Sequence, residues 1–193
     1  MNLTKVFVYG TLKKGEPNHK TLSETAGLYK FVSEGTTIQK YPLIIATKFN
    51  IPFLLNDPEK GHRIEGEIYE VDQEKLMTLD DLEAYPTLYD RKVEMIELKG
   101  RNEHVEAYVY LLRKWNEKIF EGATEMLESY ASLGPHGRPY VDRYLRASQM
   151  LDDKEGYDLY SEVLGHHATQ LQTRLLTKQK AQHDLNDSTA KQL

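Results

Sequence analysis

The sequence contains no cysteine among its 193 residues. Disulfide bonds, thiolate nucleophiles and cysteine metal sites are therefore excluded, and the composition fits a reducing compartment, so we expect a cytoplasmic protein. Long apolar runs are also missing, because no stretch approaches the ~20 apolar residues that a membrane helix needs. The first apolar run, residues 6–9, is too short for a secretory signal. We expect neither a membrane role nor export.

Basic residues are fewer than acidic residues. The chain has 25 Lys and Arg against 30 Asp and Glu, a formal net charge of -5. Nucleic acid is therefore not an expected partner, because binding its phosphates requires a basic surface. The seven histidines form no HExxH motif and no i, i+4 pair. We expect no metal ion and no other cofactor.

Short strand signals fill the first part of the chain. Between Thr4 and Leu112, β-branched and aromatic runs alternate with glycine and proline, which is typical of an antiparallel sheet or barrel. The predicted strands are 5–9, 41–47, 64–71, 91–98 and 104–112. In the last strand Tyr110 faces away from an apolar row, and we interpret it as a half-buried sheet residue outside the site.

One helix is predicted after the third strand. Asp72 is a suitable N-cap, and Tyr85-Pro86 marks the end, because proline disfavours helical backbone at the residue before it. From Met150 onward the sequence turns polar, and an apolar stripe at helical spacing contains Leu164, Ala168, Leu171 and Leu175. We therefore divide the chain into a domain, 1–149, and a helical, partly disordered C-terminal extension, 150–193. The extension either packs back on the domain or docks a protein partner.

Glu83 is unusual within the predicted helix. It follows Leu76 and Leu79 at i+7 and i+4, so its carboxylate shares their apolar stripe. Spacing alone favours an ordinary role, in which Glu83 reaches water or pairs with Arg91. Asp80 and Asp81 have the positions of solvated surface residues.

A second signal is the strand that runs into Gly10. A residue without a side chain lets successive main-chain N–H groups approach a carboxylate or phosphate. Taken alone, however, such a strand end is usually only a turn.

Together and in this order, the motifs resemble the gamma-glutamylamine cyclotransferases, within the wider family of gamma-glutamyl cyclotransferase-like proteins. The Tyr-Gly-Thr-Leu opening belongs to the wider family, whereas Pro-Asn-His and Gly-Pro-His-Gly are specific to the gamma-glutamylamine branch. The resemblance covers about 5–144. Its segments are 7–13, Gly15, 17–19, 41–43, 50–52, 65–69, 79–83, Pro86, 88–89 and 134–137.

The resemblance implies an α+β fold, a small mixed β-barrel flanked by helices. It implies that Glu83 is the catalytic acid/base and that the loop of Tyr9, Gly10, Thr11 and Leu12 binds the glutamyl group. The implied substrate is γ-glutamyl-ε-lysine from degraded transglutaminase cross-links. Its α-amine attacks its own γ-amide carbonyl, giving 5-oxoproline and free lysine. The apolar setting of Glu83 should raise its pKa toward the working pH.

Two alternatives remain open at this stage. The leaving-group pocket is not visible in the sequence, so the same reaction on γ-glutamyl amino acids is possible. The chain could instead be a non-catalytic scaffold that keeps the barrel and binds a protein through its C-terminal helix. Retention of both Glu83 and the Tyr-Gly-Thr-Leu loop favours catalysis, because a scaffold has no use for that pair.

Overall fold

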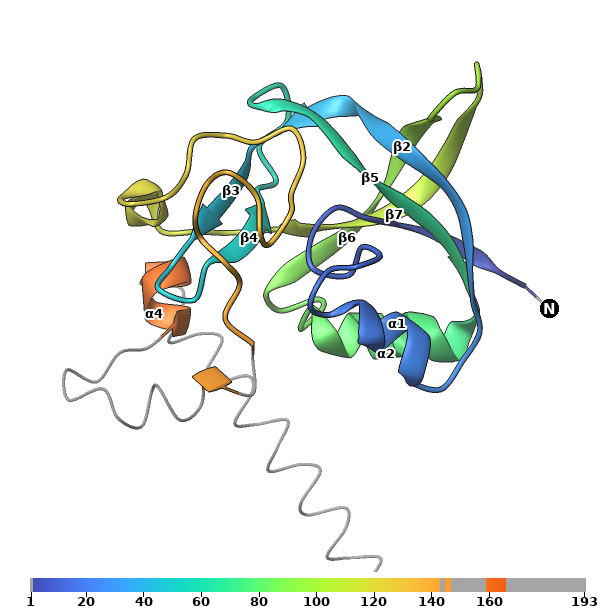
Figure 1. The fold of residues 1–193 in the computed structure, drawn as a ribbon, viewed down its shortest axis with the longest axis horizontal. Coiled ribbons are helices and arrows are strands. Elements are labelled where there is room, and N and C mark those ends of the chain that lie inside the picture. Colours follow the sequence, from blue (N-terminus) through green and yellow to red (C-terminus); the bar gives the residue numbers. More distant parts are fainter. Residues whose placement is uncertain (1, 143–144, 147–158, 166–193) are drawn as a thin grey trace, which may run out of the picture.

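The computed structural model describes residues 2–142, 145–146 and 159–165 (Figure 1). The strands are β1 (Thr4–Val8), β2 (Tyr29–Tyr41), β3 (Leu43–Ala46), β4 (Ile51–Leu54), β5 (His62–Val71), β6 (Tyr89–Leu98) and β7 (His104–Leu112). The helices are α1 (His19–Glu24), α2 (Gln73–Leu82), the 3-10 turn η1 (Glu117–Phe120) and α4 (Leu159–Leu164).

Five strands close into a barrel in the order β1-β5-β2-β6-β7. All neighbours are antiparallel except β1 and β7, which pair in parallel with Val6 opposite Tyr108 and so close the barrel. β3 and β4 form a separate hairpin beside it. The predicted α+β fold with a mixed barrel and flanking helices is therefore confirmed.

The prediction of a single strand over residues 41–47 is wrong. This range joins the last residue of β2 to β3, and the chain breaks at Pro42, which has no N–H to donate to a ladder. Sequence analysis missed β2, because register shifts between Phe31 and Ser33 and between Thr36 and Lys40 disturb its alternation. It also missed β4, the strand that contains a proline, and the six-residue helix α1.

Some strands of the barrel are buried on both faces. Along β1, Phe7 belongs to an inner cluster with Ile68 and Ile96. The alternate residues Val6 and Val8 belong to an outer cluster that includes residues of α1, α2 and α4. The same outer cluster contains Tyr110, which is only 3% exposed and therefore more buried than the sequence indicates.

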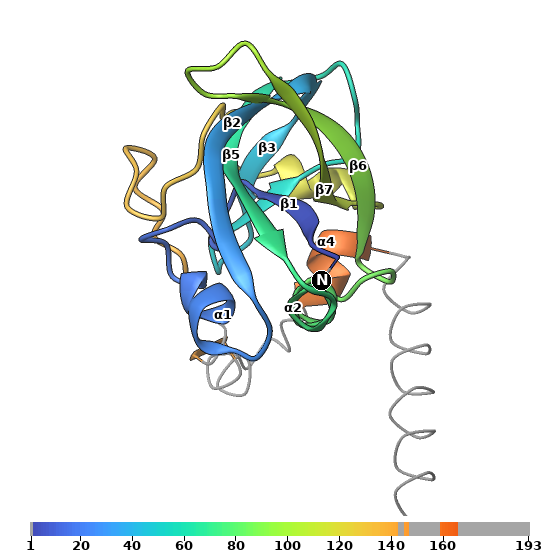
Figure 2. The same ribbon diagram turned by 90° about the vertical axis from the view of Figure 1, so that its right-hand side faces the viewer.

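Helices α1 and α2 lie side by side against the barrel (Figures 1 and 2). The predicted N-cap of α2 is confirmed, since Asp72 Oδ1 accepts a hydrogen bond from the Lys75 main-chain N–H at 2.9 Å. The helix ends at Leu82, before the predicted end at Tyr85.

Lys75 joins the two helices. Its side chain is fully buried, and Nζ donates to the carbonyl oxygens of Leu22 and Thr25, each at 2.7 Å, and to Thr25 Oγ1 at 2.8 Å. These acceptors lie at the C-terminal end of α1, where unpaired carbonyl groups and the helix dipole favour a cation. Lys75 therefore fixes α2 relative to α1.

The Lys75→Met variant is expected to lower the free energy of unfolding by about 2 to 4 kcal/mol, because it leaves one buried and two partly buried oxygen acceptors without a charged donor. Urea denaturation measures this change. Lys30→Met is the matched control. The Lys30 side chain is 75% exposed, and its Nζ lies 3.9 Å from Glu70 Oε2, which makes a weak surface ion pair. The control should change the free energy by no more than about 0.5 kcal/mol. Equal effects of both variants would contradict a structural role for Lys75.

Among the residues that the structure describes, no helix combines the length and the apolar character needed to cross a membrane. Of the predicted extension, α4 is described and contains Leu164 at its last position. The other stripe residues, Ala168, Leu171 and Leu175, lie outside the described residues.

Candidate active site

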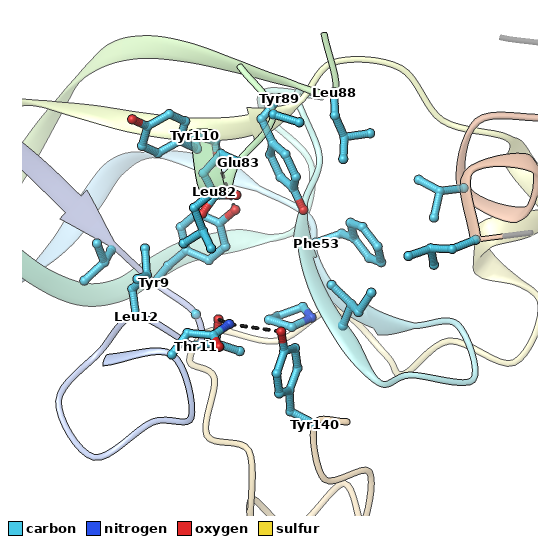
Figure 3. Close-up of a pocket in the computed structure, with 18 of the residues that line it drawn as sticks. Tyr9, Thr11, Leu12, Phe53, Leu82, Glu83, Leu88, Tyr89, Tyr110 and Tyr140 are labelled. Atoms are coloured by element: carbon cyan, nitrogen blue, oxygen red, sulfur yellow. Dashed lines mark hydrogen bonds between the residues drawn. The ribbon is translucent and has the colours of Figure 1, made fainter. Parts of the chain in front are cut away.

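The residues predicted to form the site line one cavity of about 430 Å³ (Figure 3). Tyr9, Gly10, Thr11 and Leu12 come from the end of β1, and Glu83 comes from the end of α2. The fold therefore brings together two segments that are far apart in the sequence.

A tight turn follows β1. The Lys13 N–H donates to the Gly10 carbonyl at 3.2 Å, so Thr11 and Leu12 are its central residues. Within the described part of the chain, their main-chain N–H groups donate to no protein acceptor. A Cβ at Gly10 would lie 3.3 Å from Pro52 Cγ, so glycine suits the close approach of the turn to β4. The turn therefore offers two N–H donors at the cavity wall.

Asn18 holds the turn in place. Its main-chain N–H donates to the Thr11 carbonyl at 2.9 Å, and its side-chain Nδ2 donates to Thr11 Oγ1 and to the Tyr140 hydroxyl, both at 2.9 Å. Figure 3 shows the bond to Tyr140 crossing the floor of the cavity. Asn18 is recognisable in the sequence only as part of a motif, and no sequence signal indicates Tyr140, because their contact joins distant segments.

The turn that follows α2 orients Glu83. Glu83 is the C-cap residue, the Tyr85 N–H donates to the Asp80 carbonyl at 2.9 Å, and the Ala84 N–H donates to the Asp81 carbonyl at 3.2 Å. This pattern is a Schellman motif, which requires a left-handed residue next after the C-cap. Ala84 takes that conformation with φ of 50° although it is not glycine. Glu83 is partly buried and lines the cavity.

Three tyrosines surround Glu83 (Figure 3). Burial and then the charge of Glu83 raise the pKa of Tyr9 well above its usual value. Burial raises the pKa of Tyr89 in the same way, with smaller effects from Tyr9 and Glu83. Both phenols therefore stay neutral and protonated at physiological pH. The Tyr9 hydroxyl donates to the Tyr110 main-chain carbonyl at 2.9 Å.

Two expectations about the acidic residues need correction. Arg91 does not pair with Glu83, because its Nη1 donates to both carboxylate oxygens of Asp80, at 2.7 and 2.6 Å. Asp80 is not an ordinary surface residue, since it also accepts a 2.6 Å hydrogen bond from the Tyr110 hydroxyl. The hydroxyl of Tyr110 is therefore engaged by Asp80, although the residue lines the cavity. Asp81 is exposed, as expected.

One end of the cavity is apolar. Phe53 and Leu88 lie there, away from the turn after β1 (Figure 3). Leu159, Tyr160 and Val163 of α4 also line the cavity. Sequence analysis did not predict this wall, because the periodicity of the extension indicates a helix but not the surface against which it packs.

Within the described residues, no group of three or more histidine, aspartate or glutamate side chains is arranged to hold a metal ion. The cavity instead presents a carboxylate, neutral phenols and main-chain N–H groups. Such a set can bind a zwitterionic molecule and move a proton within it.

Residues 6–132 match the family model described as "Gamma-glutamyl cyclotransferase, AIG2-like". The chain belongs to this family. It is 42% identical over 153 residues to the gamma-glutamylaminecyclotransferase of Mus musculus, which covers 73% of this chain and 98% of the mouse protein. It is 39% identical over 188 residues to gamma-glutamylaminecyclotransferase B of Danio rerio, which covers 94% of this chain and 95% of the fish protein.

The fold agrees with this membership. The crystal structure of an AIG2-like protein from Mus musculus has 40% sequence identity and a TM-score of 0.70, covering 74% of this chain and 98% of the mouse chain. The family resemblance inferred from the motifs is therefore confirmed, and the chain is a member of a family of cyclising enzymes.

Replacing Ala84 tests the strain in the turn that carries Glu83. Ala84→Gly is expected to raise the free energy of unfolding by up to about 1 kcal/mol, because glycine adopts a positive φ without steric cost. Ala84→Val should lower it by at least about 1 kcal/mol, since a β-branched residue is disfavoured at positive φ. Thermal or urea denaturation distinguishes the two variants. Equal stabilities would show that this backbone conformation is not maintained in solution.

Proposed function

We propose that this chain is a gamma-glutamylamine cyclotransferase that converts γ-glutamyl-ε-lysine and related γ-glutamyl amines to 5-oxoproline and the free amine. The observation that supports this proposal is the position of Glu83, which lines the same cavity as the Tyr9 to Leu12 segment in a chain of this family. The names of its mouse and fish relatives agree with the proposed activity.

The turn after β1 is the proposed binding site for the glutamyl group. The N–H groups of Thr11 and Leu12 can donate to its α-carboxylate, because consecutive main-chain donors form an anion-binding concavity. Nucleophile and electrophile belong to one molecule, so holding it in the cyclising conformer supplies much of the rate acceleration. No external nucleophile is needed.

Glu83 is the proposed acid/base. As a carboxylate it accepts a proton from the α-ammonium, and the resulting amine attacks the γ-carbonyl carbon. The protonated Glu83 then gives its proton to the departing nitrogen as the C–N bond breaks. The regenerated carboxylate takes the second proton from the ring nitrogen and passes it to the free amine, which leaves a neutral lactam N–H and the Glu83 carboxylate. The Tyr89 phenol, which its raised pKa keeps protonated, is a donor available to the tetrahedral oxyanion.

The remaining proposals rest on sequence. We propose a cytoplasmic location. We also propose that the chain consists of a domain, residues 1–149, and an extension, 150–193, which is the candidate site for a protein partner. Within that extension, Val163 and Leu164 of α4 are 2% and 4% exposed and belong to the outer core of the domain. This part of the extension packs against the barrel, so a partner would bind beyond it.

Glu83→Gln is expected to lower kcat by about 10² to 10⁴, because an amide cannot exchange the proton. Formation of 5-oxoproline from γ-glutamyl-ε-lysine measures kcat. Binding of the product 5-oxoproline, measured by calorimetry, should be nearly unchanged, since it does not require proton transfer.

Asp81→Asn is the control for this variant. Asp81 lines the same cavity and lies two residues before Glu83, but it is exposed. The control should retain kcat close to that of the unmodified protein. Full activity of Glu83→Gln, or an equal loss in both variants, would refute the assignment of Glu83.

A further inference from the structure

The cavity has two chemically different ends (Figure 3). Thr11, Leu12 and Tyr140 lie at one end, beside the N–H donors of the turn. Phe53 and Leu88 lie at the other end. Glu83 contributes to the wall between them. A bound molecule that spans the cavity therefore contacts polar groups at one end and apolar groups at the other.

Helix α4 completes the apolar end and is held firmly. The Asn116 N–H donates to the Val163 carbonyl at 2.7 Å, and Val163 shares the outer core cluster with Phe53. Gly165, with φ of 55°, follows the helix and packs against Asn116. These contacts turn Leu159, Tyr160 and Val163 toward the cavity. The helix lies beyond residues 6–132, which the family model matches.

Charged side chains are placed elsewhere in the cavity. Among the described lining residues they are Asp81, Glu83 and Arg146. Asp81 and Glu83 belong to the end of α2, and the Arg146 guanidinium lies 4.6 Å from the Tyr140 ring centre. The described residues that β4 and α4 contribute to the cavity carry no charge. The apolar end is therefore suited to hydrocarbon and not to an ionic group.

We infer that this end, with Leu159 of α4 in its wall, binds the hydrocarbon stem of the leaving amine. The inference rests on the proposed function, since the glutamyl carboxylate and ammonium require the polar end and Glu83 must reach both nitrogens. The amine then extends toward α4. The enzyme selects γ-glutamyl amides by the length of an unbranched apolar stem, and a charged group at the far end of the amine adds little to recognition.

A series of amides tests this selection on the full chain. The substrates are γ-glutamyl methylamide, propylamide and pentylamide together with γ-glutamyl-ε-lysine, and 5-oxoproline is the readout. We expect kcat/KM to rise about fourfold for each buried methylene. The pentylamide, which lacks the charged groups of lysine, should be used at least as well as γ-glutamyl-ε-lysine.

The Leu159→Ala variant tests whether α4 contributes to the selection of amides by stem length. This variant should reduce kcat/KM for the pentylamide by about tenfold, as expected for loss of apolar contact area, and leave the methylamide unchanged. Unchanged methylamide turnover also shows that the variant is folded. Ser161→Ala, at an exposed position of the same helix, is the matched control and should change neither substrate.

The outcomes separate the inference from the proposed function. If the methylamide is cyclised but kcat/KM does not depend on stem length, or γ-glutamyl-ε-lysine is preferred by tenfold or more, the apolar subsite is refuted and the cyclotransferase stands. An equal loss for both amides in Leu159→Ala also refutes it. If no substrate of the series yields 5-oxoproline, the proposed function itself fails.

Discussion

Tyr110 connects the two halves of the candidate site through two hydrogen bonds. Its hydroxyl donates to Asp80 of α2 at 2.6 Å, and its main-chain carbonyl accepts from the Tyr9 hydroxyl at 2.9 Å. Asp80 lies three residues before Glu83, the C-cap of α2, and Tyr9 begins the loop that lines the same cavity. One residue of β7 therefore links the helix of Glu83, the proposed acid/base, to the turn that we propose binds the glutamyl group. A shift of either segment would break a buried or partly buried hydrogen bond, which costs about 1 to 3 kcal/mol.

Closure of the barrel makes this connection possible. The parallel pairing of β1 with β7 places Val6 opposite Tyr108, so two residues further along both strands the end of β1 lies beside Tyr110. Antiparallel neighbours alone would leave β1 as an open edge. The Arg91 side chain adds rigidity, because it binds both oxygens of Asp80 and stacks between the rings of Tyr85 and Tyr108 at 4.7 and 4.6 Å. The geometry of the candidate site is thus supported by the sheet and not by the loops alone.

The sequence predicts features that depend on local chemistry. The Asp72 cap and the apolar stripe of α2 follow from residues within two turns, and the Tyr9 to Leu12 turn follows from a strand that meets glycine. Features that depend on distant partners could not be predicted in this way. Asp80 has the spacing of a surface residue, and its partly buried hydrogen bond depends on Tyr110 of β7, which is distant in the sequence. The irregular strand β2 was missed for a related reason, since its bulges disrupt the alternation that identifies strands.

The apolar end of the cavity, the proposed binding site of the amine, is attached by other hydrogen bonds than the polar end. Helix α4 is attached through Asn116 and through Val163 and Leu164 in the outer core, whereas Glu83 and the turn are linked through Tyr110 and Asp80. The two sets of hydrogen bonds share no residue, but Tyr110, Val163 and Leu164 belong to the same outer core cluster. A substitution in the wall proposed to contact the leaving amine can therefore preserve the hydrogen bonds of Asp80 and Tyr110, although it alters the core on which both ends pack. The proposed choice of amine and the proposed cyclisation chemistry therefore depend on separate hydrogen bonds that are built on one shared apolar core.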